Sequence, residues 1–487
     1  MYKLNTHVLQ ILLRAFSLLA FSLLLSGCDN ASETPTPKAS APVVNKEKVI
    51  TFVTINSPNT YYVDGNSEFA GLEYDLAKLF VQELDDGTQL KFIVENHIDQ
   101  VIPNLINGKA DIAAADITVT EARKMRIDFS NPYQDVQQQV VYNKTYIKKP
   151  PKNIKDLIGK NIAVPAGTSF SERLLKLHEQ EPALFWEERR DVDSENLIYE
   201  VANGEVDFTI ADSHLIAVLQ NYYPNLGVAF AIGQPEKIAW GISKSADPKL
   251  QAKANAFFTK IKSNGTLRNL IDRYHGHAKR LNPLDVKTFL IRSNTLLPKY
   301  IQLFKQAQDI TGIDWRLLAA ISYQESHWDT FSTSPTNVRG LMMLTEATAD
   351  RMGVTDRLDP KQSIPAGAKY INLMVDTVPE RVPEPDRTYM ALASYNIGYA
   401  HVEDARVLAQ RLKLNPDSWA DVKKTLLMLN NANYYVNAKY GYCGCGQPII
   451  FVESIRSYHN ILLRYQPAHN TDQDNFRLAS ANQAAPI

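Results

Sequence analysis

The hydrophobic and polar positions of this chain follow different patterns before and after about residue 298. In the first half, short apolar runs alternate with amphipathic stretches, as in the predicted strand 49–55, the helix beginning near residue 71 and the strand 90–94. Short strands that alternate with helices predict an α/β fold. From residue 298 onward the apolar positions follow a helical period, which predicts an all-α region.

One acidic residue falls on an apolar helical stripe. Residues 315–323 form a helix-like run, and Glu325 follows Ile321 by four positions and Leu318 by seven. These spacings place its carboxylate in line with buried side chains. Burial raises the pKa of a carboxyl group, and a raised pKa suits a proton donor near neutral pH. The alternative is that Glu325 ends the helix at the surface, in contact with water.

Length and charge limit the class of protein. The chain has 487 residues, of which 45% are hydrophobic and 22% are charged, and its net charge is −1. This length predicts two or three domains with cores of ordinary size. The near-neutral charge argues against a nucleic-acid partner.

The first residues have the pattern of a secretory signal. Lys3 and Arg14 bracket a region that is followed by an apolar run over residues 15–25, which is too short for a spanning helix. The run ends in Leu-Ser-Gly-Cys at 25–28, which resembles the bacterial lipobox. The resemblance implies a signal peptide over 1–27 and acylation of Cys28, which would anchor the chain to a membrane surface. A plain signal peptide with an incidental cysteine is the alternative.

The residues that follow predict a tether. Residues 28–48 are rich in Ser, Thr, Pro, Ala and Lys and have no apolar period, as in flexible linkers. The two other cysteines, Cys443 and Cys445, are separated by one glycine, so a bridge between them is expected to be strained. No His or Cys lies beside them at metal-ligand spacing. We therefore expect no metal and no cofactor, and we assign this pair no function.

Several segments of the first half resemble a known family. They are Asn-Leu-Ile-Asn-Gly-Lys-Ala-Asp-Ile at 104–112, Asp-Ile-Thr-Val-Thr-Glu-Ala-Arg at 116–123 and Ile-Asp-Phe-Ser-Asn-Pro-Tyr at 127–133. Together with the strand-to-helix segment 162–169 and the acid-ended strand 204–212, they resemble the amino-acid-binding branch of the periplasmic solute-binding proteins. The resemblance covers residues 49–275 and implies a two-lobed, non-catalytic α/β domain.

This resemblance implies a site for an amino-acid or muropeptide ligand. Arg123 offers a planar fork for a carboxylate, with Thr118 and the helix N-terminus at Thr168 beside it. Asp212 is expected to take the ammonium group of the ligand, and Tyr61 to cover an apolar side chain.

Asp116 departs from the family pattern, which has a small residue at this position. An extra carboxylate would repel a simple amino acid or select a basic or peptide ligand. The alternative is that the two lobes persist as a scaffold and bind nothing.

Three segments of the second half resemble the lysozyme-like catalytic domain of lytic murein transglycosylases. Glu325-Ser326 matches the Glu-Ser pair of the family, Gly-Leu-Met at 340–342 matches its Gly-Leu-Met segment, and Ser-Tyr-Asn-Ile-Gly at 394–398 matches its Ala-Tyr-Asn-x-Gly segment. We expect the segment at 340–345 to begin a helix. The resemblance covers residues 298–465, with a connector at 276–297 before it and a disordered tail at 466–487 after it.

The resemblance implies that Glu325 is the catalytic acid. Ser326, Tyr395 and Asn396 are expected to position Glu325 and a peptidoglycan glycan strand. Helix-end capping is the competing interpretation, for Ser326 in particular.

Two positions in the second half depart from the family. Met343 stands where a Gln usually follows Gly-Leu-Met, and Phe451 stands where the family has a late Tyr. Phe451 keeps the ring and lacks the hydroxyl, so any hydrogen bond to Glu325 is expected from elsewhere, with Tyr395 as the nearest candidate.

The sequence shows no second catalytic acid, since Asp329 has the surroundings of a loop residue. Most glycosidases use two carboxylates, whereas a single acid suits the transglycosylase reaction that the resemblance implies. That reaction cleaves the bond between N-acetylmuramic acid and N-acetylglucosamine and leaves 1,6-anhydromuramoyl ends. A water-using muramidase and a wall-binding sensor without turnover are the alternatives.

The fusion of the two regions predicts regulation and a location. Closure of a two-lobed domain on its ligand is expected to modulate cleavage. The protein is expected on the periplasmic face of the cell envelope. Family resemblance favours the outer membrane, whereas Asp29 resembles the residue that retains enterobacterial lipoproteins on the inner membrane.

Overall fold

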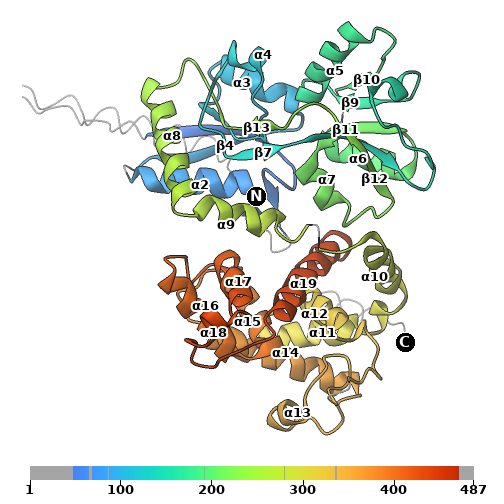
Figure 1. Ribbon diagram of the computed structural model, residues 1–487, viewed down its shortest axis with the longest axis vertical. Coiled ribbons are helices and arrows are strands. Elements are labelled where there is room, and N and C mark those ends of the chain that lie inside the picture. The colour runs from blue at the N-terminus through green and yellow to red at the C-terminus, as the bar shows by residue number, and fades with distance from the viewer. Residues whose placement is uncertain are drawn as a thin grey trace, which may run out of the picture. The chain divides into compact units, whose positions relative to one another are not determined.

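The computed structural model describes residues 48–470, apart from 65–67, 86, 191, 279 and 335–336 (Figure 1). The predicted signal peptide, the predicted lipidation site Cys28, Asp29, nearly all of the predicted tether and residues 471–487 lie outside the described residues. No helix within the described part of the chain is both long and apolar enough to cross a membrane. An α/β region is followed by an all-helical region, so the predicted multidomain fold class is confirmed.

The first lobe is built on a five-stranded sheet with the strand order β4-β1-β5-β14-β6. These strands are β4 (Gln89–Glu95), β1 (Val49–Ile55), β5 (Ile112–Ala113), β14 (Gly241–Ile242) and β6 (Asp128–Phe129). β1 pairs in parallel with β4 and β5, whereas β14 is antiparallel to both of its neighbours. Aromatic side chains, among them Phe80 of α2 (Leu72–Leu84) and Phe257 of α8 (Pro248–Ser263), pack against Trp240 in a buried core. A separate cluster joins α3 (Val101–Ile106) to the sheet.

The second lobe has a three-stranded antiparallel sheet in which β8 (Gln138–Asn143) lies between β11 (Phe208–Asp212) and β12 (Leu226–Ala231). Two further strands, β9 (Ala163–Pro165) and β10 (Glu187–Arg189), pair in parallel. Helices α5 (Ser169–Gln180), α6 (Ser194–Asn203) and α7 (Ser213–Leu219) complete the lobe. The chain passes between the lobes at β7 (Gln134–Val136) and β13 (Glu236–Ile238), which pair with each other. α9 (Thr266–His275) closes the region.

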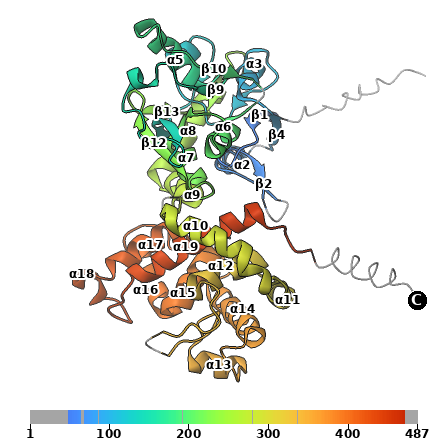
Figure 2. The same cartoon turned by 90° about the vertical axis from the view of Figure 1, so that its right-hand side faces the viewer.

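The second half is helical. Its helices are α10 (Pro283–Thr295), α11 (Ile301–Thr311), α12 (Trp315–Ser326), α13 (Glu346–Met352), α14 (Pro360–Thr377), α15 (Asp386–Ile397), α16 (Tyr399–Arg411), α17 (Trp419–Met428), α18 (Ala432–Tyr435) and α19 (Gly446–Tyr465). α19 packs against α12, α15 and α17, and it runs along the upper side of these helices in Figure 2. One buried cluster unites these helices into a single core.

Two segments that flank residues 298–465 also contact this helical region. α10 lies within the predicted connector 276–297, yet its Phe289 is fully buried and packs on Tyr323, with ring centroids 4.6 Å apart. At the other end, His469 lies beyond the predicted boundary, and its backbone oxygen accepts a hydrogen bond from Gln308 at 3.0 Å. Both segments therefore belong to the bundle. The first contributes the buried Phe289 ring, and the second contributes the backbone oxygen of His469.

The predicted helix at 340–345 is wrong. The residues form a turn, and α13 begins only at Glu346. The backbone φ is +79° at Gly340 and +46° at Met343, and a right-handed helix excludes such angles. The segment Gly340–Leu344 is therefore held as a loop by the surrounding helices.

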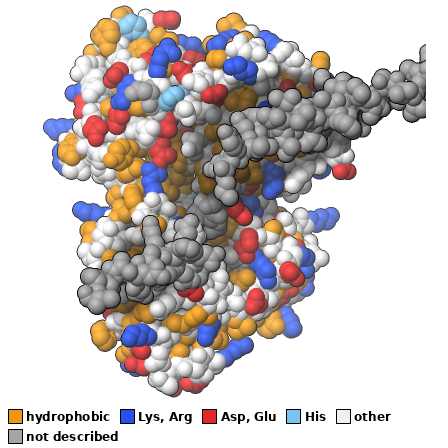
Figure 3. Space-filling view, turned by 180° about the vertical axis from the view of Figure 1, so that it is seen from behind, with side chains coloured by type: hydrophobic (Ala, Val, Ile, Leu, Met, Phe, Trp, Pro, Cys, Tyr) orange, Lys and Arg blue, Asp and Glu red, His pale blue; other side chains and the backbone are white. Residues whose placement is uncertain are grey.

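Acidic and basic side chains are interspersed over the face shown in Figure 3. This distribution agrees with the net charge of −1 over the whole chain.

Candidate functional site

Helix α12 carries Glu325 near its C-terminal end. Asp314 caps the N-terminus, because its Oδ1 accepts a hydrogen bond from the Arg316 backbone N–H at 2.7 Å. The helix ends where His327 and Trp328 adopt left-handed φ angles of 53° and 60°. The fully buried Trp328 ring then folds back and donates a hydrogen bond to the Ala319 carbonyl at 3.0 Å. This hydrogen bond fixes the last turn of the helix.

Glu325 is largely enclosed by protein. Leu318 and Ile321, which precede it on the same helical face, are fully buried, and Glu325 itself is only partly exposed. Burial raises the pKa of Glu325 to about 8. Within the described residues its carboxyl group has no ion pair, so nothing offsets the cost of ionising it. This enclosure argues against a fully solvated helix end, and a pKa of about 8 keeps the side chain mostly protonated at pH 7.

Two serines of α12 bind the Gly-Leu-Met turn. The hydroxyl groups of Ser322 and Ser326 donate to the Leu341 carbonyl at 3.1 and 3.0 Å. Ser326 also reaches the Ser322 carbonyl at 3.1 Å. Ser326 therefore anchors the turn to the Glu325 helix. Ser322 was not among the predicted site residues, although its position one turn before Ser326 places both hydroxyls on one face.

The next residue of the turn, Met342, is held from two other helices. Its backbone N–H donates to the Ser363 hydroxyl of α14 at 3.3 Å, and its carbonyl accepts from the Tyr395 hydroxyl of α15 at 2.6 Å. Met342 and Ser363 are fully buried. Met343 follows in a left-handed conformation at the end of this fixed segment. The turn is thus fastened by hydroxyl groups of three helices.

Tyr395 lies beside the candidate acid. Burial, followed by the charge of Glu325, raises the pKa of Tyr395 well above its ordinary value. The Tyr395 hydroxyl donates its proton to the Met342 carbonyl. Toward Glu325 the phenolic oxygen can therefore act only as a hydrogen-bond acceptor. Phe451 of α19 stacks on the Tyr395 ring at a centroid distance of 6.4 Å and an interplanar angle of 8°. Asn396 is exposed at the next position.

Two other predictions concern loops of this region. Asp329 is exposed, and its Oδ1 accepts a hydrogen bond from the Phe331 N–H at 3.0 Å, as expected of a loop residue. Cys443 and Cys445 form a disulfide just before α19. The Cys445 N–H donates to the Asn430 side chain at 3.0 Å, which ties the start of α19 to the preceding segment.

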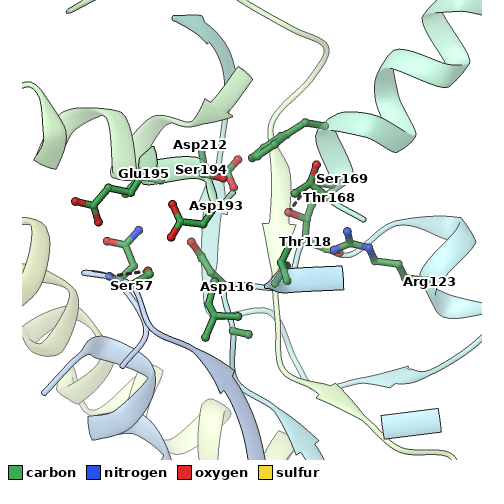
Figure 4. A pocket seen from close by; sticks show the side chains of 16 residues that line it. Ser57, Asp116, Thr118, Arg123, Thr168, Ser169, Asp193, Ser194, Glu195 and Asp212 are labelled. Atoms are coloured by element: carbon green, nitrogen blue, oxygen red, sulfur yellow. Dashed lines mark hydrogen bonds between the residues drawn. The ribbon is translucent and has the colours of Figure 1, made fainter. Parts of the chain in front are cut away.

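A second candidate site lies between the two lobes of the α/β region (Figure 4). It is a cavity whose walls come from both lobes. The residues that line it are Ile55, Ser57, Asn59, Ile98, Ala115, Asp116, Thr118, Arg123, Thr168, Ser169, Phe170, Asp193, Ser194, Glu195, Asp212 and Leu215. Four of the five predicted ligand residues are thus brought together. The fifth, Tyr61, does not line the cavity, because its ring packs against Phe69, Tyr74 and Phe92.

Arg123 is already bound by the protein. Its Nε donates to Glu172 of the other lobe at 2.7 Å, and its two terminal nitrogens donate to the backbone oxygens of Thr118 and Gly167 at 3.2 and 3.1 Å. Thr168 caps helix α5 by accepting a hydrogen bond from the Ser171 N–H. Glu172, in the first turn of α5, was not predicted from the sequence as a partner of Arg123.

Asp116 forms a buried pair with His214, which was not predicted from the sequence either. Its Oδ2 lies 2.7 Å from Nε2 of His214. Burial opposes both charges, yet the pairing lowers the pKa of Asp116 and raises the pKa of His214. Asp212 has a buried Oδ1 without a hydrogen-bond partner, and burial raises its pKa to about 7.

Family profiles match both halves of the chain. "Bacterial extracellular solute-binding proteins, family 3" matches residues 49–277, and "Transglycosylase SLT domain" matches residues 302–416. The chain is also similar to a solved structure, "An ancestral arginine-binding protein bound to arginine". That likeness has 26% identity and a TM-score of 0.42, over 47% of this chain and 98% of the other.

Curated relatives match nearly the whole chain. The "Membrane-bound lytic murein transglycosylase F" of Methylobacillus flagellatus is 56% identical over 96% of this chain and 98% of its own length. The proteins of the same name from Nitrosospira multiformis and Pseudomonas fluorescens are 42% and 41% identical, and each alignment covers at least 91% of both chains. The chain therefore belongs to the membrane-bound lytic murein transglycosylase F family and is a lyase that acts on peptidoglycan.

Proposed function

We propose that the protein cleaves the β-1,4 bond between N-acetylmuramic acid and N-acetylglucosamine and leaves 1,6-anhydromuramoyl ends. The observation that supports this most strongly is the state of Glu325. Its pKa of about 8 keeps it protonated at neutral pH, and no ion pair holds it within the described residues. One such group can act as an acid first and as a base afterwards.

Glu325 serves both steps of the reaction. In the first step its proton passes to the glycosidic oxygen, the bond from C1 to that oxygen breaks, and N-acetylglucosamine leaves as an alcohol. The acetamido group of the substrate stabilises the cationic centre at C1. In the second step the Glu325 carboxylate takes the proton of the C6 hydroxyl, whose oxygen bonds to C1. No water and no cofactor are consumed.

The surrounding residues position the acid and the glycan. Ser326 holds the Gly-Leu-Met turn against α12, and Tyr395 holds the same turn from α15. Met343, Asn396 and Phe451 are assigned to the glycan-contacting wall, because they lie at or beside these fixed groups.

Product analysis tests the reaction type. Purified peptidoglycan is digested with the full chain, and the released fragments are weighed by mass spectrometry. Anhydro ends are the expected result. Reducing ends, each heavier by one water, would instead identify the protein as a muramidase.

The Glu325→Gln variant tests the role of the acid. We expect it to release no fragments while keeping the fold. Equal release by the variant and the wild type would refute the role of Glu325. An absence of release by wild type would favour a wall-binding sensor without turnover.

We further propose that the α/β region binds an amino-acid or peptide ligand that modulates cleavage. Arg123, Thr118, Thr168 and Asp212 surround one cavity, and the cavity lies between two lobes that the strands β7 and β13 join. Hinge closure on a ligand changes the shape of such a domain. Turnover measured with and without a ligand of demonstrated affinity tests this, and an unchanged rate would contradict it.

Anchoring through Cys28 is the third part of the proposal. The lipobox-like sequence at 25–28 supports acylation. Replacing Cys28 by Ala is expected to release the protein from the membrane fraction into the periplasm. Separation of inner and outer membranes then shows which of the two carries the wild-type protein.

A further inference from the structure

The cavity of the α/β region has an excess of negative charge in its walls. Four carboxylates and one guanidinium line it, and the carboxylates come from both lobes. Figure 4 shows the side chains of Asp116, Asp193 and Asp212 directed into the same space, with Arg123 at the opposite side. The ion pairs that these groups already form within the protein determine which charge a ligand must carry to neutralise the cavity.

Half of the carboxylates are already neutralised by the protein. Asp116 pairs with His214 at 2.7 Å, and Glu195 pairs with Arg464 at 2.5 Å. Arg123 is bound to a carboxylate of α5, as described above, so its positive charge is also offset. Once these pairs are counted, two of the four carboxylates that line the cavity remain to be considered.

The two remaining carboxylates belong to Asp193 and Asp212, and neither has an ion pair within the part of the chain that the structure describes. Asp212 is 7% exposed, and its Oδ1 lacks any hydrogen-bond partner. Asp193 caps α6 by accepting a hydrogen bond from the Asn196 N–H at 2.7 Å, which engages one oxygen and supplies no full positive charge. A third acceptor, Oδ1 of the buried Asn59, also has no partner. The unsatisfied groups of this cavity are therefore acceptors, and two of them are carboxylates.

We propose that the cavity selects an amino acid with a cationic side chain. Its α-ammonium group binds Asp212 and Asn59, and its side-chain cation binds Asp193. The inference rests on the proposed ligand site and names the class of its ligand. A neutral side chain would leave the Asp193 carboxylate, which lines the cavity and accepts one backbone hydrogen bond, without a counter-charge, and the attraction between opposite charges would be lost.

Calorimetric titration of the full chain with two ligands tests the proposal. L-lysine and L-norleucine have side chains of similar length that end in an ammonium and a methyl group respectively. We expect L-lysine to bind at least about tenfold more tightly, because only its side chain carries an ammonium group that can pair with the Asp193 carboxylate. Equal affinities would overturn the proposal and leave the ligand site itself standing. Binding of neither ligand would overturn both the proposal and the amino-acid ligand of the proposed function.

The Asp193→Asn variant tests whether Asp193 binds the side-chain cation of the ligand. Asn is as good a helix N-cap as Asp, so the variant keeps the start of α6 and removes only the charge. It is expected to reduce the preference for L-lysine over L-norleucine at least about fivefold. Asp247→Asn is the matched control, because Asp247 caps α8 outside the cavity by accepting from the Lys249 N–H at 2.9 Å. An unchanged preference in Asp193→Asn, or an equal loss in the control, would overturn the assignment.

Discussion

Replacing Glu325 by Gln is expected to stabilise the catalytic region while it abolishes turnover. The pKa of Glu325 is raised from 4.5 to about 8 in the folded protein. Below pH 4.5 the group is protonated in both the folded and the unfolded chain, and its contribution to stability is fully present. As the pH rises toward 8, the unfolded chain loses the proton first, so this stability is lost. Gln cannot ionise, so the variant retains this contribution to stability as the pH rises.

The size of the effect follows from the difference between the pKa of Glu325 in the folded chain and its pKa in the unfolded chain. A difference of one pH unit between the two values corresponds to about 1.4 kcal/mol, so the free energy of unfolding of the variant should exceed that of wild type by about 3 kcal/mol at pH 7 and about 5 kcal/mol at pH 8 and above. At pH 4.5 the two proteins should be nearly equal. A gain of this size raises the melting temperature of a domain of this length by several degrees.

Calorimetry of the full chain at several pH values between 4.5 and 8.5 measures the difference. Glu380→Gln provides the control, because this exposed glutamate lies in the same helical region. The control should melt like wild type at every pH. A difference between Glu325→Gln and wild type that does not grow with pH would refute the reasoning, since it would show that the acid is not held protonated by burial.

Four further outcomes follow from the geometry of the site. The kcat of wild type should fall about tenfold per pH unit above pH 8, because Glu325 must carry a proton, and a pH profile of fragment release measures this. Tyr395→Phe leaves a buried carbonyl without its donor and should cost about 1–3 kcal/mol in denaturant unfolding, with a lower kcat. Phe451→Tyr restores a hydroxyl beside Tyr395 and should raise kcat about threefold, whereas an unchanged kcat would show that the hydroxyl is not needed here. Gly340→Ala should cost at least about 2 kcal/mol, because its φ is +79° and a Cβ would overlap a backbone oxygen, whereas Gly353→Ala, with a φ of +73° and open space around it, should cost less.

The sequence by itself determined the class of each half and the character of Glu325. The apolar positions before Glu325 belong to one helix, and the spacing along a helix fixes which side chains share a face. The spacing therefore placed the acid in line with an apolar stripe but left a surface position open, and burial in the folded chain raises its pKa. Strand β1 and the caps at Asp314 and Thr168 were predictable in the same way, since their signals lie within a few residues.

Only the tertiary structure decided what surrounds these groups. The Met342 carbonyl meets a hydroxyl 53 positions away at Tyr395, and Arg123 meets a carboxylate 49 positions away at Glu172. The predicted helix at 340–345 failed because hydroxyl groups of other helices hold the segment as a turn. The spacing of apolar residues along the chain shows which side chains share one face of a helix or strand. A contact between two such elements depends instead on how the whole core packs. The partners of Glu325 and of the ligand cavity are therefore properties of the fold.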